Sequence, residues 1–481
     1  MRIIIIGAGF AGLGAAVKVK EAGFTAITVL EQANDVGGTW LANTYPGCAC
    51  DIQSNLYSFS FEPNPHWTRT YPRQPEILAY LQHVAHKYAI RPLIRFNTEV
   101  TEARWDDAAN VWNVHTATGD VHTAEILING TGPLSRPKNP DVVGLDRFQG
   151  TLFHSARWNH HHSLSGERVA VIGTGASAIQ FVPEIAPDTA QTYVFQRTAP
   201  WVVPRNDRPF TAKETRLFTR FPIVQRAYRA KIWLRAEMFG LALLGNQRVS
   251  KQISDGGTQF IRALVTDPEL QVKVTPHFAP GCKRLLISND WYPALTQPNV
   301  ELVTEPITEV RAHSVITADG TERTVDTIVL ATGFAATEFL APMKIFGRTS
   351  RELSEAWQDG AQTHFGISVS EFPNLFIMVG PSTGLGHNSI VFMMEAQLHW
   401  IVGALKHLRS RGAKSVDVRP NVQATSYADI QQRMKKTVWL TGCSSWYRSA
   451  DGRVDTLWPG LTWEYWLRTR RFRVRQYCVT K

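Results

Sequence analysis

Three glycines close to the N-terminus, Gly7, Gly9 and Gly12, have the spacing of a loop that holds a pyrophosphate. They follow a β-branched run at residues 2–6 and precede a helix-forming stretch at residues 13–22. The sequence therefore predicts a buried strand, a tight turn and a helix in that order. In such a turn the first glycine permits the bend, the second lets phosphates reach backbone N–H groups, and the third lets the helix pack on the strand.

A carboxylate suited to a ribose diol ends the next predicted strand. This strand, at residues 26–30, is followed by Glu31, 19 residues after Gly12, which is the usual separation in dinucleotide-binding domains. A glycine-rich turn in an unrelated α/β protein is the alternative, and the complete series of strand, turn, helix and acid disfavours it. We interpret this unit as an FAD site.

The same arrangement recurs further along the chain. A predicted strand at residues 168–172 leads directly into Gly173 and Gly175, followed by Ser177. Ala178 stands where the first unit has its third glycine, and alanine is a tolerated variant there. The sequence thus predicts a second dinucleotide site.

The second unit ends on a cation instead of an acid. Its next strand, predicted at residues 192–196, is followed by Arg197 and Thr198. A guanidinium at this point suits the 2′-phosphate of NADP, although a surface arginine beside a loop is the alternative. Two such sites predict a relay in which NADPH reduces a bound flavin, either for a further reaction or as a plain flavin reductase or electron-transfer protein.

The cysteines are few, odd in number and scattered, so they predict neither a disulfide framework nor a zinc site. We expect all of them to be reduced thiols in a cytoplasmic protein. Cys48 and Cys50 lack the spacing of a redox-active dithiol, which argues against a disulfide reductase. The cysteines are Cys48, Cys50, Cys282, Cys443 and Cys478.

Between the two units, residues 148–159 resemble the FxGxxxHxxxW signature of Baeyer–Villiger monooxygenases, with His154 and Trp158 as its histidine and tryptophan. Relatives that oxygenate sulfur or nitrogen usually carry Tyr or Phe at the position of Trp158. Pro or Asp normally follows the tryptophan in this family, and Asn159 departs from that pattern. We expect His154 to be a hydrogen-bonded hinge between domains.

Further segments similar to the same family occur in the same order along nearly the whole chain. The C-terminal residues 445–447 and 457–460 resemble a subgroup that differs from the cyclohexanone-type members, so substrate preference does not transfer from those members. The other similar segments are residues 37–40, 45–47 with Asp51, 195–198, 281–284, 331–334, and 380–381 with Asn388.

The resemblance implies an FAD- and NADPH-dependent monooxygenase that inserts one oxygen atom from O2 beside a ketone carbonyl. The product would be an ester or a lactone, formed through a flavin peroxide and a tetrahedral adduct. Asp51 and Arg284 would be the active-site pair, Lys283 a second partner for the 2′-phosphate, and Trp446 a residue closing over the cofactor. Outside the two glycine turns, the implied cofactor-binding residues are Gly38, Thr39, Trp40, Asp51, Lys283 and Trp446.

The chemistry of ketone oxygenation explains why an arginine would be needed. A guanidinium stays charged at any working pH and offers several donors, so Arg284 could stabilise both a peroxide anion and the oxyanion of the adduct. Asp51 could orient the arginine and offset its charge. Taken singly, Asp51 reads as a turn residue and Arg284 as a surface cation. An oxygenase acting on sulfur or nitrogen uses a protonated peroxide and depends less on Arg284, and it remains the alternative.

The expected strands and helices must position these residues. Their order predicts an α/β protein with two Rossmann-like dinucleotide-binding domains and a helical subdomain. Prolines between residues 133 and 140, and the segment 331–336, mark two crossings between domains. The FAD domain is therefore expected to be discontinuous, with the NADPH domain inserted. The expected parts are 1–140 and 331–481 for FAD, 141–210 and 276–330 for NADPH, and 211–275 for the helical subdomain.

Composition excludes several other classes. The chain of 481 residues is 44% hydrophobic and 19% charged, as in ordinary globular proteins, and we expect no stable membrane insertion. The run at 238–244 is expected to be a buried helix lining the substrate cavity, with membrane-surface contact as the alternative.

The net charge of +10 is concentrated in the C-terminal tail. We expect residues 471–475 to form a half-buried edge strand and not a nucleic-acid site, although an acidic partner of the tail, in a protein that is not an enzyme, stays open. The histidines at 160–162 lack metal-ligand spacing, so no metal is expected. The oligomeric state is not predicted.

Overall fold

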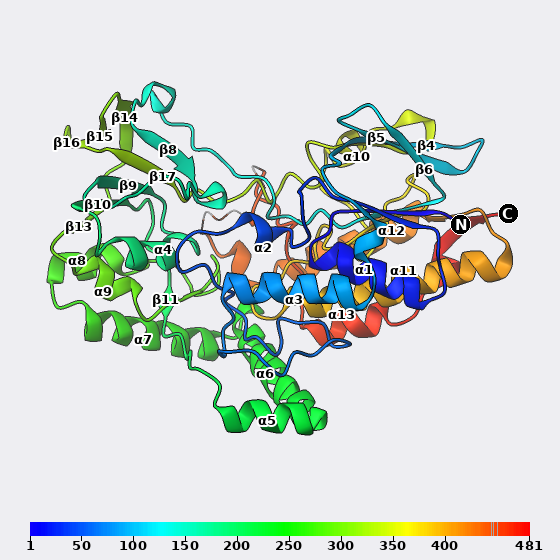
Figure 1. Ribbon diagram of the computed structural model, residues 1–481, viewed down its shortest axis with the longest axis horizontal. Coiled ribbons are helices and arrows are strands. Elements are labelled where there is room, and N and C mark those ends of the chain that lie inside the picture. Colours follow the sequence, from blue (N-terminus) through cyan, green and yellow to red (C-terminus); the bar gives the residue numbers. More distant parts are fainter. Residues whose placement is uncertain (444, 446, 450) are drawn as a thin grey trace.

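The computed structural model describes residues 1–443, 445, 447–449 and 451–481. One parallel sheet has the strand order β19-β7-β1-β2-β3, and a second has the order β13-β10-β9-β17-β8. Figure 1 shows the second sheet in the left lobe of the molecule, apart from the N-terminal unit. The first sheet comprises β1 (Ile3–Ile6), β2 (Ile27–Leu30), β3 (Ile94–Arg95), β7 (Ile126–Asn129) and β19 (Leu375–Ile377). The second comprises β8 (Thr151–His154), β9 (Arg168–Ile172), β10 (Gln191–Phe195), β13 (Val300–Val303) and β17 (Thr327–Leu330).

The central strands are hydrophobic on both faces because helices or other sheets cover both faces of a parallel sheet. All four residues of β1 are buried, as are all four of β7 and of β17. The glycine turns follow β1 and β9, so each lies at the carboxyl end of a central strand, where open α/β sheets bind ligands.

Smaller sheets and helices complete the two units. The smaller sheets are formed by β4 (Val100–Asp106), β5 (Val111–Thr116), β6 (Val121–Ala124) and β18 (Lys344–Phe346); by β14 (Ile307–Arg311), β15 (Ser314–Thr317) and β16 (Glu322–Thr324); by β11 (Val202–Val203) and β12 (Leu286–Ile287); and by β20 (Ser415–Val418) and β21 (Tyr477–Thr480). The helices around them are α1 (Phe10–Glu21), α2 (Thr39–Ala42), α3 (Gln74–Lys87), α4 (Ala178–Ile185), α9 (Trp291–Leu295), α10 (Leu353–Ala356), α11 (Ile390–Arg411), α12 (Pro420–Met434) and α13 (Thr462–Thr469).

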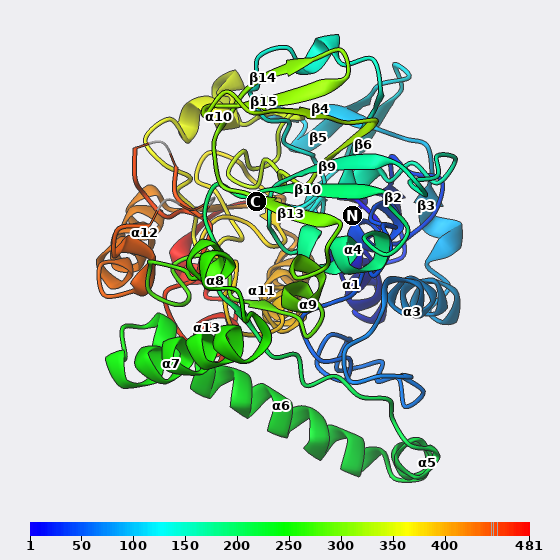
Figure 2. The same cartoon turned by 90° about the vertical axis from the view of Figure 1, so that its left-hand side faces the viewer.

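The stretch rich in helix formers is helical, as predicted. It comprises α5 (Ala212–Arg220), α6 (Pro222–Leu243), α7 (Gln247–Leu264) and α8 (Pro268–Val274). The first of these helices begins with a capping box, in which Thr211 and Glu214 satisfy each other's backbone N–H groups. Figure 2 shows α6 as a long helix along the lower edge of the molecule, with α5 at its outer end.

The two crossings between the units lie side by side, so the chain leaves and re-enters the N-terminal unit at one place. Pro137 and Phe334 form an antiparallel bridge, and the N–H of Lys138 donates to the carbonyl of Gly333 over 2.9 Å. Because β19 returns to pair with β7, the N-terminal unit is discontinuous. The predicted fold class is confirmed, while the domain boundaries themselves stay a prediction.

One expectation about a segment is wrong, and another holds only in part. The tail strand is Tyr477–Thr480, paired with β20, and not residues 471–475. Of this segment only Phe472 packs inward, against Trp400 and Tyr477, while Val474 and the arginines are exposed. The run at 238–244 is helical and buried on one side, at Ala242 and Leu243, while Met238 is 60% exposed. Its expected place along the substrate cavity stays a prediction. No helix in the described part of the chain is long and apolar enough to cross a membrane.

Candidate active site

The first glycine turn is held by close backbone packing. A Cβ on Gly12 would lie 1.7 Å from the carbonyl oxygen of Gly7, and one on Gly7 would lie 2.8 Å from that of Gly130. Glu31 is buried at this turn, where its carboxylate accepts the N–H of Ala8 over 2.6 Å. The turn and the acid predicted to serve one ligand therefore meet at the end of β1.

The segment Gly38, Thr39 and Trp40 lies against the same turn. Gly38 has a φ of +54°, and a Cβ on it would lie 3.0 Å from the Cα of Gly9. Thr39 begins α2, and the buried Trp40 donates its Nε1–H to the hydroxyl of Tyr57 over 3.1 Å. These residues are brought together with the first glycine turn.

The second glycine turn has open space at its middle glycine, Gly175. Gly173 has a φ of +111° and packs against Ala331. A Cβ on Gly175 would meet no atom within 4 Å among the described residues, and Ser177 precedes the first residue of α4. A phosphate has room to approach backbone N–H groups at this helix N-terminus.

The two cations predicted to face the 2′-phosphate come from different segments. Arg197 and Thr198 are exposed, two and three residues after the end of β10. Lys283 lies close enough that burial and then the charge of Arg197 lower the pKa of the Lys283 ammonium. Two cations held near each other form a site suited to a multiply charged anion.

Asp51 and Arg284 form an ion pair although 233 positions separate them in the chain. The carboxylate accepts from Nε of Arg284 over 2.7 Å and from its terminal nitrogen over 2.6 Å. The Asp51 carboxylate raises the pKa of the Arg284 guanidinium against the opposing effect of burial. Both side chains stay partly exposed, at 25% and 32%, so the arginine is charged and its remaining donors can be reached.

The loop that carries Asp51 contacts both nucleotide units. Gln180 of α4 accepts from the hydroxyl of Tyr45 over 3.1 Å and donates to the carbonyl of Ala49 over 3.1 Å. The pair with Arg284 therefore lies where the first unit meets the helix that follows the second glycine turn.

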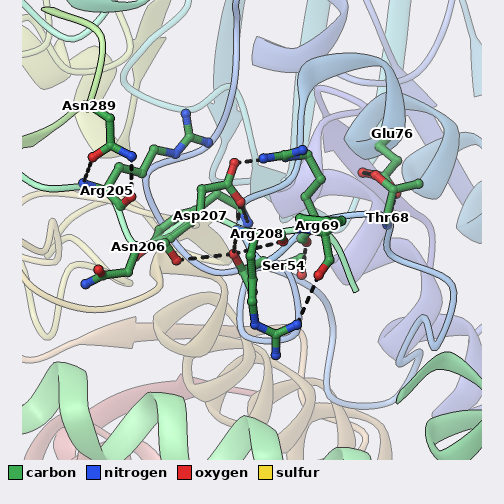
Figure 3. Close-up of polar contacts among 12 residues, drawn as sticks. Ser54, Thr68, Arg69, Glu76, Arg205, Asn206, Asp207, Arg208 and Asn289 are labelled. Carbon is green, nitrogen blue, oxygen red and sulfur yellow. Dashed lines mark hydrogen bonds and ion pairs between the residues drawn. The ribbon is translucent and has the colours of Figure 1, made fainter. Parts of the chain in front are cut away.

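A second set of contacts ties together the segments that follow Asp51 and Arg284 (Figure 3). Asp207 accepts from Nε of Arg69 and from the hydroxyl of Thr70, both over 2.9 Å. Burial raises the pKa of Asp207, but these hydrogen bonds outweigh it and hold the pKa below its usual range. Arg205 and Asn289 exchange two hydrogen bonds of 2.9 and 2.8 Å. The loops on both sides of the ion pair are thus fastened to each other.

Tyr447 was missed by the sequence reasoning. Its side chain is buried close to Arg284. Burial raises the pKa of the Tyr447 hydroxyl, and the charge of Arg284 opposes that rise. The signal for it is the C-terminal segment 445–447, which resembles the family and contains this tyrosine. Trp446 itself lies outside the described residues, so its expected role stays a prediction.

The histidines do not form a metal site. His154 is buried and its Nδ1 accepts the N–H of Ala156 over 3.0 Å, while its ring packs against Phe334 at the crossing between units. His160 and His162 bond to different partners, Thr44 and Glu167. The described residues contain no group of side chains that could hold a metal ion.

The comparisons with known proteins decide the family. The family model for pyridine nucleotide-disulphide oxidoreductases matches residues 4–214. A Baeyer-Villiger monooxygenase of Pseudomonas aeruginosa is 43% identical over 481 residues, covering 100% of this chain and 91% of the relative. The chain belongs to the Baeyer–Villiger monooxygenases.

Solved members of the fold agree over the full length. An oxidized steroid monooxygenase bound to NADP has a TM-score of 0.89 at 31% identity, and the structure of OTEMO in complex with FAD and NADP has a TM-score of 0.90 at 28% identity. Each alignment covers 100% of this chain and 99% of the solved one. The resemblance stated from the signature residues is confirmed.

This Baeyer–Villiger monooxygenase contains a disulfide, and the expectation that all cysteines are reduced is wrong. Cys282 and Cys443 are bonded, with their Cα atoms 6.2 Å apart and 161 positions between them in the chain. Local cysteine spacing could not predict this pair, because only the fold brings the two segments together. Cys48 and Cys50 are free and buried, and burial raises the pKa of the Cys48 thiol to about 12. Burial also raises the pKa of the Cys50 thiol, and a thiol that stays protonated is a poor nucleophile.

The disulfide fastens the C-terminal loop to the segment that carries Arg284. We expect Cys443→Ser to lower the free energy of unfolding by about 2–5 kcal/mol, because the unfolded chain loses a long cross-link. Chemical denaturation of the FAD-loaded protein measures this. Cys478→Ser, which removes an exposed free thiol, is the control and should unfold like the parent. Five titratable thiols in the denatured, unreduced parent, instead of three, would refute the bond.

Proposed function

We propose that this chain inserts one oxygen atom from O2 next to the carbonyl of a small-molecule ketone, giving an ester or a lactone, with FAD and NADPH as cofactors. The observation that carries this is the Asp51–Arg284 ion pair, held where the two dinucleotide units meet. Membership of the family and the FAD and NADP bound by solved relatives support it.

The residues present fit both cofactors. The pyrophosphate of FAD would lie over Gly9, its ribose beside Glu31, and Gly38, Thr39 and Trp40 would contact it because they pack on the same turn. Bound FAD would supply hydride acceptance and oxygen activation.

NADPH would lie at the second turn. The open space at Gly175 admits its pyrophosphate, with Gly173 and Ser177 shaping the loop. The 2′-phosphate would face Arg197, Thr198 and Lys283.

Arg284 performs the step that distinguishes ketone oxygenation. When the substrate carbonyl is attacked, negative charge develops on its oxygen, and a fixed guanidinium donor stabilises that charge. Asp51 occupies Nε and one terminal nitrogen, which fixes the plane of the guanidinium, and Tyr447 contacts the same group. A guanidinium has five N–H donors, so it can still donate to the substrate. Trp446 would close over this site. A cytoplasmic location is part of the proposal, since the NADPH it needs is an intracellular reductant.

The cation pair should decide cofactor preference. Replacing Arg197 and Lys283 together by alanine is expected to raise KM for NADPH about tenfold to hundredfold, because charge-assisted hydrogen bonds to the phosphate are lost. KM for NADH, which has no 2′-phosphate, should change little. Steady-state kinetics with both cofactors measure this, with exposed Arg311→Ala as the control. An equal rise for both cofactors would contradict the assignment.

The activity itself is tested with a substrate panel under labelled oxygen. The FAD-loaded protein is given NADPH, 18O2 and cyclic, linear and aromatic ketones, with a sulfide and an amine alongside. We expect one labelled oxygen in an ester or lactone and product formation matched to NADPH consumption. Label only in sulfoxide or N-oxide would select heteroatom oxygenation, and hydrogen peroxide as the sole product with every compound would select a flavin reductase.

A further inference from the structure

The outward face of α6 is an apolar stripe. Ile223 and Leu234 are 68% and 56% exposed. Two exposed alanines lie between them along the helix, and the exposed Met238 lies one turn after Leu234. The spacing of three or four residues keeps the stripe on one side of the helix over about 27 Å. Its members, which we call the α6 stripe, are Ile223, Ala227, Ala230, Leu234, Met238 and Leu241.

Buried polar side chains of α6 fix this orientation. Gln225 donates to Asn55 over 2.7 Å and Arg229 to the carbonyl of Ser58 over 2.8 Å. The buried carboxylate of Glu237 accepts from the hydroxyl of Thr462 over 2.7 Å. Rolling the helix to hide the stripe would break these buried bonds, so the apolar side stays outward.

The same region exposes aromatic side chains. Thr462, which binds Glu237 and accepts from Trp233 of α6 over 2.9 Å, is the first residue of α13. One face of α13 exposes Trp463, Trp466 and Leu467. Tryptophans are enriched where proteins meet the headgroup region of a bilayer.

The exposed charges of α5 and α6 that lack an ion-pair partner among the described residues are all positive. The acids of α5 and α6 are both paired: Glu214 binds Arg208, and Glu237 is buried. The exposed cations of the two helices have no such partner among the described ion pairs. They are Lys213, Arg216, Arg220, Arg226, Lys231 and Arg235.

We infer that this face docks reversibly on an anionic lipid bilayer, with the α6 stripe in the interface and the flanking cations at the lipid headgroups. An apolar helix face flanked by cations is the pattern of helices that lie in a membrane surface, and anionic headgroups complement the cations. A second copy of the chain is a poorer occupant, because it would bring the same cations face to face. A hydrated nucleic acid would leave the stripe uncovered.

Docking would place the catalytic loop near the bilayer, a consequence that rests on the proposed function. Leu243, at the end of α6, packs closely against Gly281: a Cβ added to Gly281 would lie 2.2 Å from a methyl carbon of Leu243. Gly281 is three residues before Arg284. The C-terminal end of α6 therefore packs beside the segment that carries Arg284.

The test is flotation of the FAD-loaded protein with vesicles, without any ketone, so its outcome is independent of the activity. Vesicles of phosphatidylcholine alone are compared with equal parts of phosphatidylcholine and phosphatidylglycerol. We expect at least about tenfold stronger partition into the anionic vesicles, weakened by high salt. Absence of binding to anionic vesicles overturns the inference.

Two sets of substitutions separate the apolar and charged contributions. L234S with M238S, and R226Q with K231Q and R235Q, should each weaken partition about tenfold or more. W463S with W466S tests the contribution of α13 and is expected to weaken it too. V121S with V272S, at equally exposed apolar positions on β6 and α8, is the control and should bind like the parent. FAD content and NADPH oxidation should stay normal in all of them.

Three results would contradict the inference. Retained vesicle binding by L234S with M238S would make the face a purely electrostatic patch. A parent dimer in sedimentation that this variant converts to a monomer would make the stripe an interface between copies. Equal loss of binding in the V121S and V272S control would show that the effect is not specific to α6.

Discussion

Replacing Arg284 by alanine is expected to lower the rate of ketone oxygenation by about 10² to 10³, the usual effect of removing one donor to a developing oxyanion. The ion pair with Asp51 keeps this guanidinium charged and oriented, so the change removes both the charge and the fixed geometry. Hydride transfer from NADPH should persist, because neither glycine turn nor the 2′-phosphate site is touched. Uncoupled NADPH oxidation should then release hydrogen peroxide in place of ester.

Three measurements isolate this effect. Anaerobic bleaching of the flavin by NADPH reports the reductive half, ester formed per NADPH reports coupling, and FAD content reports folding. Arg284→Lys keeps a charge without the planar fork and should recover only part of the rate. Lys283→Ala, at the adjacent position, should instead raise KM for NADPH with coupling preserved. Ester formation by Arg284→Ala at a near-normal rate would show that the role given to this residue is wrong.

Replacing Gly12 by alanine is expected to abolish FAD binding and to destabilise the protein by about 3 kcal/mol or more, because overpacking against rigid backbone cannot relax. The added Cβ would lie 1.7 Å from the carbonyl oxygen of Gly7. The turn would have to open, and the N–H groups of the helix N-terminus would shift away from the pyrophosphate. The ratio of flavin to protein absorbance and thermal unfolding measure the two effects.

Gly175→Ala is the control for adding a methyl group to a glycine turn that has room for it. It is the second glycine of the other turn, the counterpart of Gly9, and a Cβ there would meet open space within the described structure. We expect normal FAD content and normal thermal stability, with weaker NADPH binding because the methyl group stands in the path of the phosphates. Full FAD loading and parental stability in Gly12→Ala would contradict the packing argument.

Much of the fold was determined by local sequence. The isoleucines of β1, the glycine turn and Glu31 lie within one short stretch, and their roles depend on neighbours in the chain. The second unit repeats that local pattern, so it could be predicted in the same way. The helical subdomain followed from composition alone, and the family followed from short ordered segments, as the comparisons confirm.

The contacts of the site were decided by the tertiary structure. Asp51 and Arg284 were paired in advance only through resemblance, since 233 positions separate them. The Cys282–Cys443 bond and the approach of Tyr447 to Arg284 could not be foreseen, because each joins segments from distant parts of the chain. The exposed side of α6 was also unpredictable from its apolar run: periodicity shows that a helix has an apolar face, but only the packed neighbours determine whether that face is buried.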